Sequence, residues 1–157
     1  MKEMEEPNAL NDVARFHDTF NLPILDKPKI PAPKRCMLRI NLLEEELREL
    51  KEAIQNDDLV EVADAFCDIQ YVLSGAILEF GLGSKFKELF DEVQRSNMSK
   101  VCKTLEEAEA TQTHYMAKSA TVSHIEKKGD EFLVYRTEDG KVLKSVKYSP
   151  ADIKGKL

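Results

Sequence analysis

Two clusters of acidic residues are the features of this chain that could do chemistry. The first lies in residues 43–54 and the second in residues 61–69, and the short break Gln55-Asn56-Asp57-Asp58 separates them. At about 100° per residue, the acidic side chains of each helical segment fall on an arc beside a stripe of apolar ones. If the two stripes pack as an antiparallel hairpin, the acidic arcs meet at one edge of the contact. Carboxylates placed in this way suit a hard divalent cation, Mg²⁺ or Mn²⁺.

The second cluster most needs an explanation. Asp64 and Asp68 lie four residues apart in an otherwise apolar helix, where Asp is a poor residue. Like charges 5–6 Å apart repel by about 3 kcal/mol at an effective dielectric near 20, so beside a core they need a counter-charge. The alternative is a solvated acidic face, with Glu45 or Glu49 pairing with neighbouring Arg and Lys. Glu61 has a structural alternative of its own, because Asp58-x-x-Glu61 is typical of a capping box.

Mostly helical elements must position these acids. The periodicity predicts helices over residues 8–20, 34–56, 58–80, 85–96 and 104–118, with a proline-rich connection over 22–33. A change to period two predicts three strands, over 122–127, 131–137 and 141–148. The expected fold is mainly α: a helical bundle with a small C-terminal antiparallel β-sheet. Residues 1–103 form its core, and 104–157 form a helix and three-stranded appendage of the same domain. The side chains expected to face inward are Leu43, Leu47, Leu50 and Ile54, then Val62, Phe66, Ile69, Leu73 and Phe80, and then Phe86, Leu89, Phe90 and Val93.

Composition limits the function classes. The 157 residues carry a formal net charge of −6 and 33% charged residues, so a broad nucleic-acid-binding patch is not expected. The longest apolar run, residues 69–82, is too short for a membrane span and carries Gln70 and Glu79. Three scattered cysteines indicate reduced thiols. With no apolar segment near the N-terminus, the expected location is cytoplasmic.

The acidic segments also resemble a known superfamily. Glu45-Glu46-Leu-Arg-Glu49, followed by Ala63-Asp-Ala-Phe-Cys-Asp68, resembles the EExxE…ExxD signature of the all-α nucleoside triphosphate pyrophosphohydrolases, which include MazG, the dimeric dUTPases and phosphoribosyl-ATP pyrophosphohydrolase. Similarity to the MazG-like branch continues in three more segments. These are Phe16-His17-x-x-Phe20-Asn21-Leu-Pro-Ile24, Arg95-Ser-Asn97-Met-Ser-Lys100, and Glu138-Asp-Gly-Lys141-Val-Leu-Lys144 with Tyr148-x-Pro150.

One position departs from the signature. Ala65 stands three residues before Asp68, where ExxD has Glu. The nearest acid is Asp64, and Glu61-x-x-Asp64 satisfies ExxD in another register. Asp64 with Asp68 is the preferred pair, because residues four apart lie about 40° apart on a helix and reach the same ion.

The resemblance implies an enzyme that cleaves a nucleoside triphosphate between its α and β phosphates. It implies Glu46, Glu49, Asp64 and Asp68 as Mg²⁺ or Mn²⁺ ligands and Glu45 as the base for the attacking water. It also implies substrate contacts, and those residues are Arg95, Asn97, Lys100, His17, Lys144 and Tyr148. For His17 the alternative is an ordinary core histidine, and for Lys144 a solvated strand charge.

The resemblance further implies a homodimer or higher homo-oligomer, with Tyr71, Ile77 or Leu78 near the interface. Residues 69–80 are apolar nearly all round, and the predicted helices are too few to cover them. Two other readings stay open. In the first, the chain is a regulatory protein of this fold that binds nucleotide or metal without turnover. In the second, it is a helical interaction module with surface acids only.

Overall fold

The computed structural model describes residues 2–157, which divide into two compact units. The first unit ends at Phe86, and the second runs from Lys87 to Leu157. This boundary falls ahead of the 103/104 partition expected from the sequence, and that partition stays a prediction. In the part of the chain that is described, no helix is both long and apolar enough to cross a membrane.

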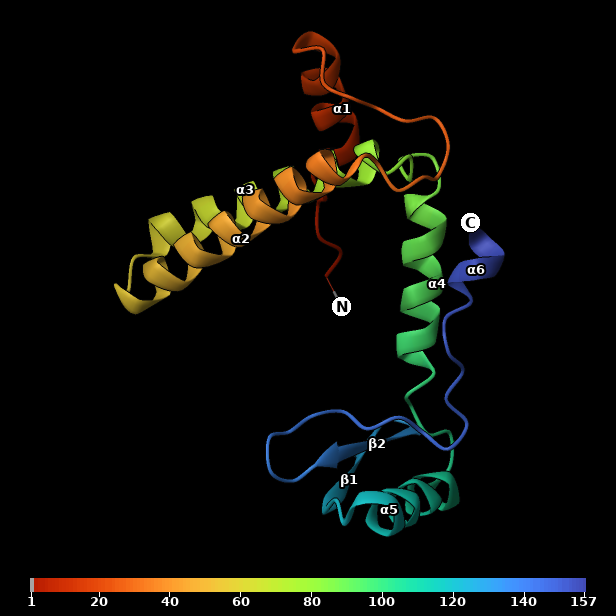
Figure 1. The fold of residues 1–157 in the computed structure, drawn as a ribbon. Coiled ribbons are helices and arrows are strands. Elements are labelled where there is room, and N and C mark those ends of the chain that lie inside the picture. The colour runs from red at the N-terminus through yellow and green to blue at the C-terminus, as the bar shows by residue number, and fades with distance from the viewer. Residues whose placement is uncertain (1) are drawn as a thin grey trace. The chain divides into compact units, whose positions relative to one another are not determined.

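The first unit consists of three helices, α1 (Ala9–Thr19), α2 (Pro33–Gln55) and α3 (Leu59–Glu79). Helix α2 begins with a proline at its first position, where the missing N–H costs no hydrogen bond. Helix α3 begins after Asp58, whose side chain accepts hydrogen bonds from the Val60 and Glu61 amides. Figure 1 shows α2 and α3 lying side by side as an antiparallel hairpin, with α1 against α3. The three predicted helices of this unit are confirmed.

Small side chains form the seam between α2 and α3. Ala53 and Ala65 are buried, whereas Leu47 and Phe66 are each 56% exposed in the single chain. The prediction that the large apolar stripes of both helices face inward is therefore wrong in part. The reason is that alanines let the two helices approach closely, so the bulky residues of each stripe lie at the edge of the contact.

The proline-rich connection covers the end of α3. The Leu25 amide donates to the Leu78 carbonyl, which also accepts from the Gly81 amide, and the Lys29 amide donates to the Phe80 carbonyl. Gly81 makes this close approach possible, because its φ is +68° and a Cβ there would lie 2.0 Å from the Lys27 carbonyl oxygen. Ile77 and Leu78 are consequently buried inside the single chain.

The second unit contains α4 (Phe86–Met98) from its second residue onward, α5 (Leu105–Ser119), strands β1 (Ser123–Lys128) and β2 (Glu131–Arg136), and the short α6 (Ile153–Lys156). Strands β1 and β2 pair antiparallel, from Ser123 opposite Arg136 to Lys128 opposite Glu131. The core of this unit, packed between α5 and the hairpin, consists of Cys102, Ala108, Val134 and Leu143.

The predicted third strand, residues 141–148, is not formed, so the expected three-stranded appendage is wrong. A single bridge joins Tyr135 and Val142. Beyond it, the chain turns away from β2 because α5 offers stronger partners. Ser145 donates to the buried Glu107 carboxylate, and the Val146 amide donates to Thr111 Oγ1 at 3.1 Å.

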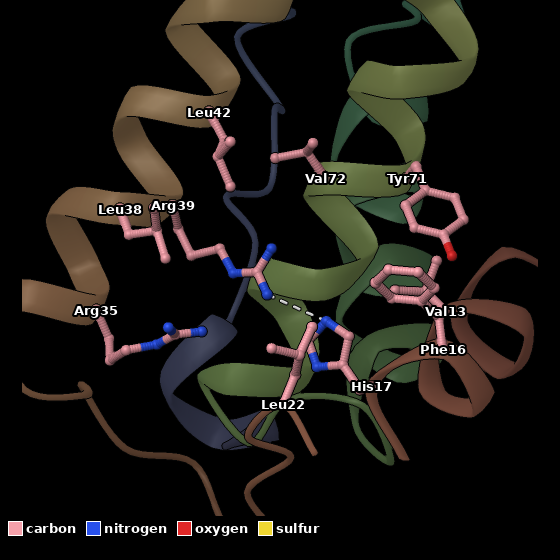
Figure 2. A pocket seen from close by; sticks show the side chains of 10 residues that line it. All are labelled: Val13, Phe16, His17, Leu22, Arg35, Leu38, Arg39, Leu42, Tyr71 and Val72. Carbon is pink, nitrogen blue, oxygen red and sulfur yellow. Dashed lines mark hydrogen bonds between the residues drawn. The ribbon is translucent and has the colours of Figure 1, made fainter. Parts of the chain in front are cut away.

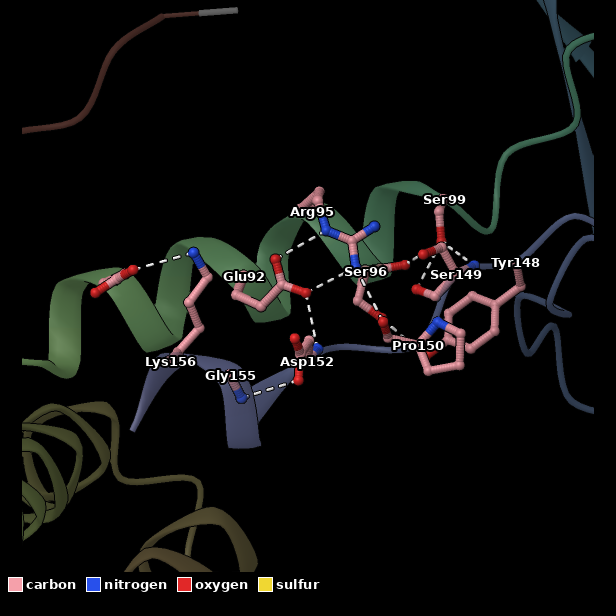
Figure 3. A network of polar contacts seen from close by, with 11 residues as sticks. Glu92, Arg95, Ser96, Ser99, Tyr148, Ser149, Pro150, Asp152, Gly155 and Lys156 are labelled. Carbon is pink, nitrogen blue, oxygen red and sulfur yellow. Dashed lines mark hydrogen bonds and ion pairs between the residues drawn. The ribbon is translucent and has the colours of Figure 1, made fainter. Parts of the chain in front are cut away.

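Helix α4 is confirmed, but its predicted inward face is partly wrong. Leu89 is buried, whereas Phe90 is 60% and Val93 40% exposed. The polar side of α4 instead carries the contacts, because it binds the C-terminal segment. Figure 3 shows Ser96 donating to the Tyr148 hydroxyl, and the Asp152 amide donating to Glu92.

Candidate active site

The hairpin brings the two acidic clusters together around Glu46. Arg35 of α2 pairs with Glu79 of α3, and the same antiparallel register sets Glu46 opposite Asp68. Burial raises the pKa of Glu46, and nearby negative charges raise it further. In decreasing order, those charges are Asp68, Glu49, Glu45 and Asp64. The other four predicted metal and base residues therefore all lie within electrostatic reach of Glu46.

Glu46 has an oxygen that needs a partner. Its Oε2 is buried and accepts no hydrogen bond within residues 2–157. An unpartnered buried carboxylate oxygen is costly, and a cation or a proton would satisfy it. The surrounding donors are carboxylates alone, which suit Mg²⁺ or Mn²⁺.

The carboxylates are close without being gathered into a coordination sphere. Among the residues described here, no three His, Cys, Asp or Glu side chains already stand in a metal-binding arrangement. Like charges repel, so drawing them closer requires a cation. The residues thus fit a divalent ion, and the metal-ligand roles stay a prediction.

Glu45 lies at the exposed side of the cluster. Arg48 approaches both Glu45 and Glu52 at 4.0 Å, with all three side chains more than half exposed. Such surface pairs are worth less than about 1 kcal/mol. Glu45 is therefore free to change partners, as a base for water must be.

The structure distinguishes the two ExxD registers. Ala65 is buried in the helix seam, and Asp64 is among the charges that act on Glu46, whereas Glu61 is not. Glu61 instead lines a polar cavity of about 310 Å³ near the helix turn, together with Glu49. The reciprocal half of the expected capping box is absent, because the Asp58 amide donates to the Ala53 carbonyl at 3.0 Å. Asp64 with Asp68 stays the predicted ligand pair.

We predict that Glu46→Gln raises metal-free stability at neutral pH. A carboxyl whose folded pKa is raised stabilises the fold at low pH, and that contribution is lost as pH rises through its folded pKa. Glu46→Gln cannot ionise, so the variant does not lose stability at this position as the pH rises. Thermal melts from pH 4 upward in EDTA test it, with the exposed Glu44→Gln as the matched control. A variant as pH-dependent as the wild type would contradict the prediction.

A second charged cluster, which no local sequence pattern predicts, lies on the same hairpin. Glu79 is 1% exposed and receives hydrogen bonds from Arg35 and Arg39. Burial alone would raise the pKa of Glu79, but the two arginines outweigh it and hold the pKa below its usual range. Arg39 is itself only 8% exposed.

His17 reaches this cluster from α1. It is 1% exposed, with Nδ1 2.9 Å from the Pro23 carbonyl oxygen and Nε2 3.1 Å from Arg39 Nη2. Arginine can only donate, so Nε2 accepts and Nδ1 carries the proton to Pro23. Both ring nitrogens of His17 are therefore occupied by the protein itself. A substrate contact by His17 stays a prediction, and it would use the ring rather than a nitrogen.

An apolar pocket of about 310 Å³ opens beside this cluster (Figure 2). Its lining residues are Val13, Phe16, His17, Leu22, Arg35, Leu38, Arg39, Leu42, Tyr71 and Val72. Leu42 and Val72 each lie four residues from the acidic cluster, at Glu46 and Asp68. Four residues of helix rise about 6 Å. The pocket and the carboxylates are thus neighbours along one hairpin.

The predicted substrate residues of the second unit gather around Tyr148. Ser96 donates to its hydroxyl, which lowers the pKa of Tyr148, and the charges of Lys144, Lys100 and Arg95 lower it further. Lys144 Nζ lies 4.4 Å from the centre of the Tyr148 ring. Lys100 donates to Asn97 Oδ1 at 2.8 Å. A group of cations around one hydroxyl suits a phosphate.

Arg95 is already engaged within this unit. It donates twice to Glu92, lowering the pKa of that carboxyl to about 2, and once to the Pro150 carbonyl at 3.0 Å. Figure 3 shows Arg95 between α4 and the segment that leads to α6. Arg95 therefore holds the C-terminal segment against α4, while Lys100 is the freer cation.

The comparison with known families gives the decisive match. The sequence profile of phosphoribosyl-ATP pyrophosphohydrolase matches residues 13–97, more than half of the chain. The chain belongs to this family. The resemblance seen in the acidic motifs is thereby confirmed, together with the helical fold. The matched range contains both acidic clusters, the apolar pocket, and Arg95 and Asn97.

A viral protein is similar over nearly the whole length. Uncharacterized protein L479 of Acanthamoeba polyphaga mimivirus is 24% identical, over 90% of this chain and 92% of that protein. Coverage of 90% of the chain means that the similarity extends past the family match, beyond Lys100. The phosphoribosyl-ATP pyrophosphohydrolase family supports a hydrolase that acts on pyrophosphate bonds of nucleotides.

Proposed function

We propose that the protein is a Mg²⁺-dependent nucleoside triphosphate pyrophosphohydrolase, which releases pyrophosphate and leaves the nucleoside monophosphate. The observation that carries this proposal is Glu46. Its unpartnered, buried oxygen lies among acids of both helices, in the segment matched by the family. A fold that gathers uncompensated carboxylates at this position gains most by binding a divalent cation there.

The residues have separate tasks in this proposal. Glu46, Glu49, Asp64 and Asp68 would hold Mg²⁺ or Mn²⁺, which supplies charge for the phosphates and a more acidic water. Glu45, exposed and held only by a weak surface pair, would take the proton of the attacking water. A proton acceptor on the rim of the cluster can exchange that proton with solvent.

Ala65 supports a second candidate, a non-catalytic protein that binds nucleotide or metal. It is buried in the helix seam where the family signature has an acid, so one carboxylate of the usual set is missing. Asp64, in reach of Glu46, compensates for it in our proposal.

A pyrophosphate-release assay separates the two candidates. We expect Mg²⁺-dependent pyrophosphate from at least one member of a panel of ribo- and deoxyribonucleoside triphosphates and phosphoribosyl-ATP, and none in EDTA. Calorimetric binding of Mg²⁺ and nucleotide without release from any of them would favour the non-catalytic candidate.

We predict that Lys100→Ala lowers both turnover and nucleotide affinity, by about tenfold each, while Mg²⁺ affinity without nucleotide is unchanged. The reason is that Lys100 donates only to Asn97 within residues 2–157 and can turn to a leaving phosphate. Lys118→Ala, an exposed lysine on α5, is the control. Kinetics and calorimetry measure the two effects. Unchanged kinetics in Lys100→Ala would remove this residue from the phosphate site.

We also propose that the protein forms a homo-oligomer, most simply a dimer. Of the three residues expected near the interface, Ile77 and Leu78 are buried within the single chain, so Tyr71 is the one that we propose for direct contact. Tyr71 is 41% exposed, and the exposed Leu47 and Phe66 offer further apolar surface on the hairpin. Light scattering at micromolar concentration tests this, and a concentration-independent monomer mass would contradict it.

A further inference from the structure

We infer that Ser96 is a positioning residue that leaves the Tyr148 hydroxyl free to donate to a phosphate of the ligand. Together with Lys100 and Lys144, Tyr148 would bind the terminal phosphates of a nucleoside triphosphate, or free pyrophosphate, without a metal ion. The inference rests on the proposed function and deepens it, because it adds a positioning residue and a phosphate site that does not depend on the acidic cluster.

Ser96 is held in one orientation by its burial. It lies on α4 and is 3% exposed, and its Oγ donates to the Tyr148 hydroxyl oxygen at 2.9 Å. Figure 3 shows this hydrogen bond between α4 and the segment that leads to α6. A buried hydroxyl that loses its acceptor is costly, so Ser96 stays the donor to Tyr148.

The hydroxyl of Tyr148 is therefore left with its own proton to donate. A phenol carries one proton and accepts through its oxygen, and here Ser96 occupies that oxygen as a donor. Within residues 2–157, the Tyr148 hydroxyl donates to no protein acceptor. Tyr148 is only partly buried, so a ligand can reach this side chain. The ligand atom that takes the proton has to be an acceptor.

Two lysines favour an acceptor that is an anion. The pKa of Tyr148 is lowered first by the Ser96 hydrogen bond and then by the charges of Lys144 and Lys100, which places both charges near the hydroxyl. Lys144 Nζ lies 4.4 Å from the centre of the Tyr148 ring. In the described part of the chain, neither lysine pairs with a carboxylate. Two uncompensated cations beside a free O–H donor suit a phosphate group.

These donors differ from the acidic cluster in how they meet a phosphate. The residues around Glu46 are carboxylates, which repel a phosphate until a cation lies between them. Lys100, Lys144 and Tyr148 need no such cation, because each presents N–H or O–H groups. Ammonium and phenol donors recognise phosphate oxygens and not a base, so free pyrophosphate and the end of a nucleoside triphosphate are equivalent ligands.

Titration of Tyr148 tests the role of Ser96 in a way that a purely structural role would not affect. Ultraviolet absorbance of tyrosinate, measured with and without Tyr148→Phe in each background, isolates this residue from the other tyrosines. We expect Ser96→Ala to raise the pKa of Tyr148, because the hydrogen bond that stabilises the phenolate is lost. Ser96→Cys keeps the volume with a weaker donor, and it replaces Ser96→Ala if that variant does not fold.

Calorimetry in EDTA tests the phosphate site, with pyrophosphate and a non-hydrolysable nucleoside triphosphate as separate ligands. We expect Tyr148→Phe to lower affinity about tenfold and Ser96→Ala about threefold, as loss of a charge-assisted donor and of its orienting partner implies. Adding Ser96→Ala to Tyr148→Phe should cause no further loss, because Ser96 acts through the hydroxyl. Ser99→Ala is the control, since Ser99 accepts from the Ser149 amide without touching the phenol, and its effect should stay within about twofold.

The outcomes separate the inference from the proposed function. An unchanged titration of Tyr148 in the Ser96 variant, additive losses in the double variant, an equal loss in Ser99→Ala, or no binding of either ligand in EDTA would overturn the inference. A loss with one of the two ligands supports it and identifies that ligand as the source of the phosphate. If titration and binding are as expected but no triphosphate is hydrolysed with Mg²⁺, the proposed function alone is overturned.

Discussion

Glu49→Gln and Asp68→Asn will each lower turnover by at least about 100-fold while leaving the fold intact. Both residues belong to the acids that act on Glu46, one from each helix of the hairpin. A neutral amide of the same shape coordinates Mg²⁺ poorly, and loss of even an outer partner of a metal site costs about 10- to 100-fold. Steady-state pyrophosphate release measures the effect, and circular dichroism shows that the fold is retained.

The matched control for this pair is Glu44→Gln. Glu44 is exposed on α2, next to Glu45, but it is not among the charges that shift the pKa of Glu46. The control should keep wild-type turnover within about twofold, as surface substitutions away from a site usually do. Near-normal turnover in Glu49→Gln and Asp68→Asn would remove the acidic cluster from catalysis.

Glu79→Gln will lower the free energy of unfolding by about 3–5 kcal/mol, the usual cost of removing one partner from a buried ion pair. The change keeps the shape of the side chain but leaves Arg39, 8% exposed, without its counter-charge. Urea unfolding followed by circular dichroism measures it. Asp12→Asn, which breaks the exposed pair with Arg15, is the control and should cost less than about 1 kcal/mol. An effect of Glu79→Gln no larger than that of the control would show that the cluster does not hold the hairpin.

The same cluster gives a pH dependence of a definite sign. The folded pKa of Glu79 is lowered, so its stabilising contribution is present above the unfolded pKa and is lost as pH falls through the folded pKa. Wild-type stability should therefore fall on acidification below about pH 4.3, the ordinary value for Glu. Glu79→Gln should show a smaller fall over that range.

Most of the helices of the first unit can be predicted from the sequence, because the signals that define them are local. Apolar periodicity, Pro33 at a helix start and Asp58 as a cap place α2 and α3 within a residue or two. A break of only a few residues between two long helices requires an antiparallel hairpin, and this alone brings the acids of the two clusters to one edge. The sequence therefore predicts that the carboxylates gather around Glu46.

The buried charged cluster around Glu79 could not be predicted in the same way. In the sequence, Glu79 interrupts an apolar run, which suggests an end of burial rather than its deepest point. Its partners Arg35 and Arg39 lie more than thirty residues away, and no local pattern links them to it. The signal that was available is the register of the hairpin, since the pairing that joins Glu46 with Asp68 also joins Arg35 with Glu79.

The other wrong predictions, of a third strand and of the inward helix faces, also have tertiary causes. Period two in residues 141–148 is typical of a strand, but the Ser145 contact with buried Glu107 outweighs the sheet hydrogen bonds. The exposed Phe66 and Phe90 carry the apolar periodicity of core residues, and periodicity cannot distinguish a face buried within one chain from a face left at its surface.

The measurement that tests the account most directly is hydrolysis of a nucleoside triphosphate in ¹⁸O-labelled water with Mg²⁺. Mass spectrometry of the products shows which phosphorus the water attacks. The account predicts pyrophosphate without label and nucleoside monophosphate with one ¹⁸O atom, as attack at the α phosphorus requires. Nucleoside diphosphate with inorganic phosphate, or label in the pyrophosphate, would contradict it.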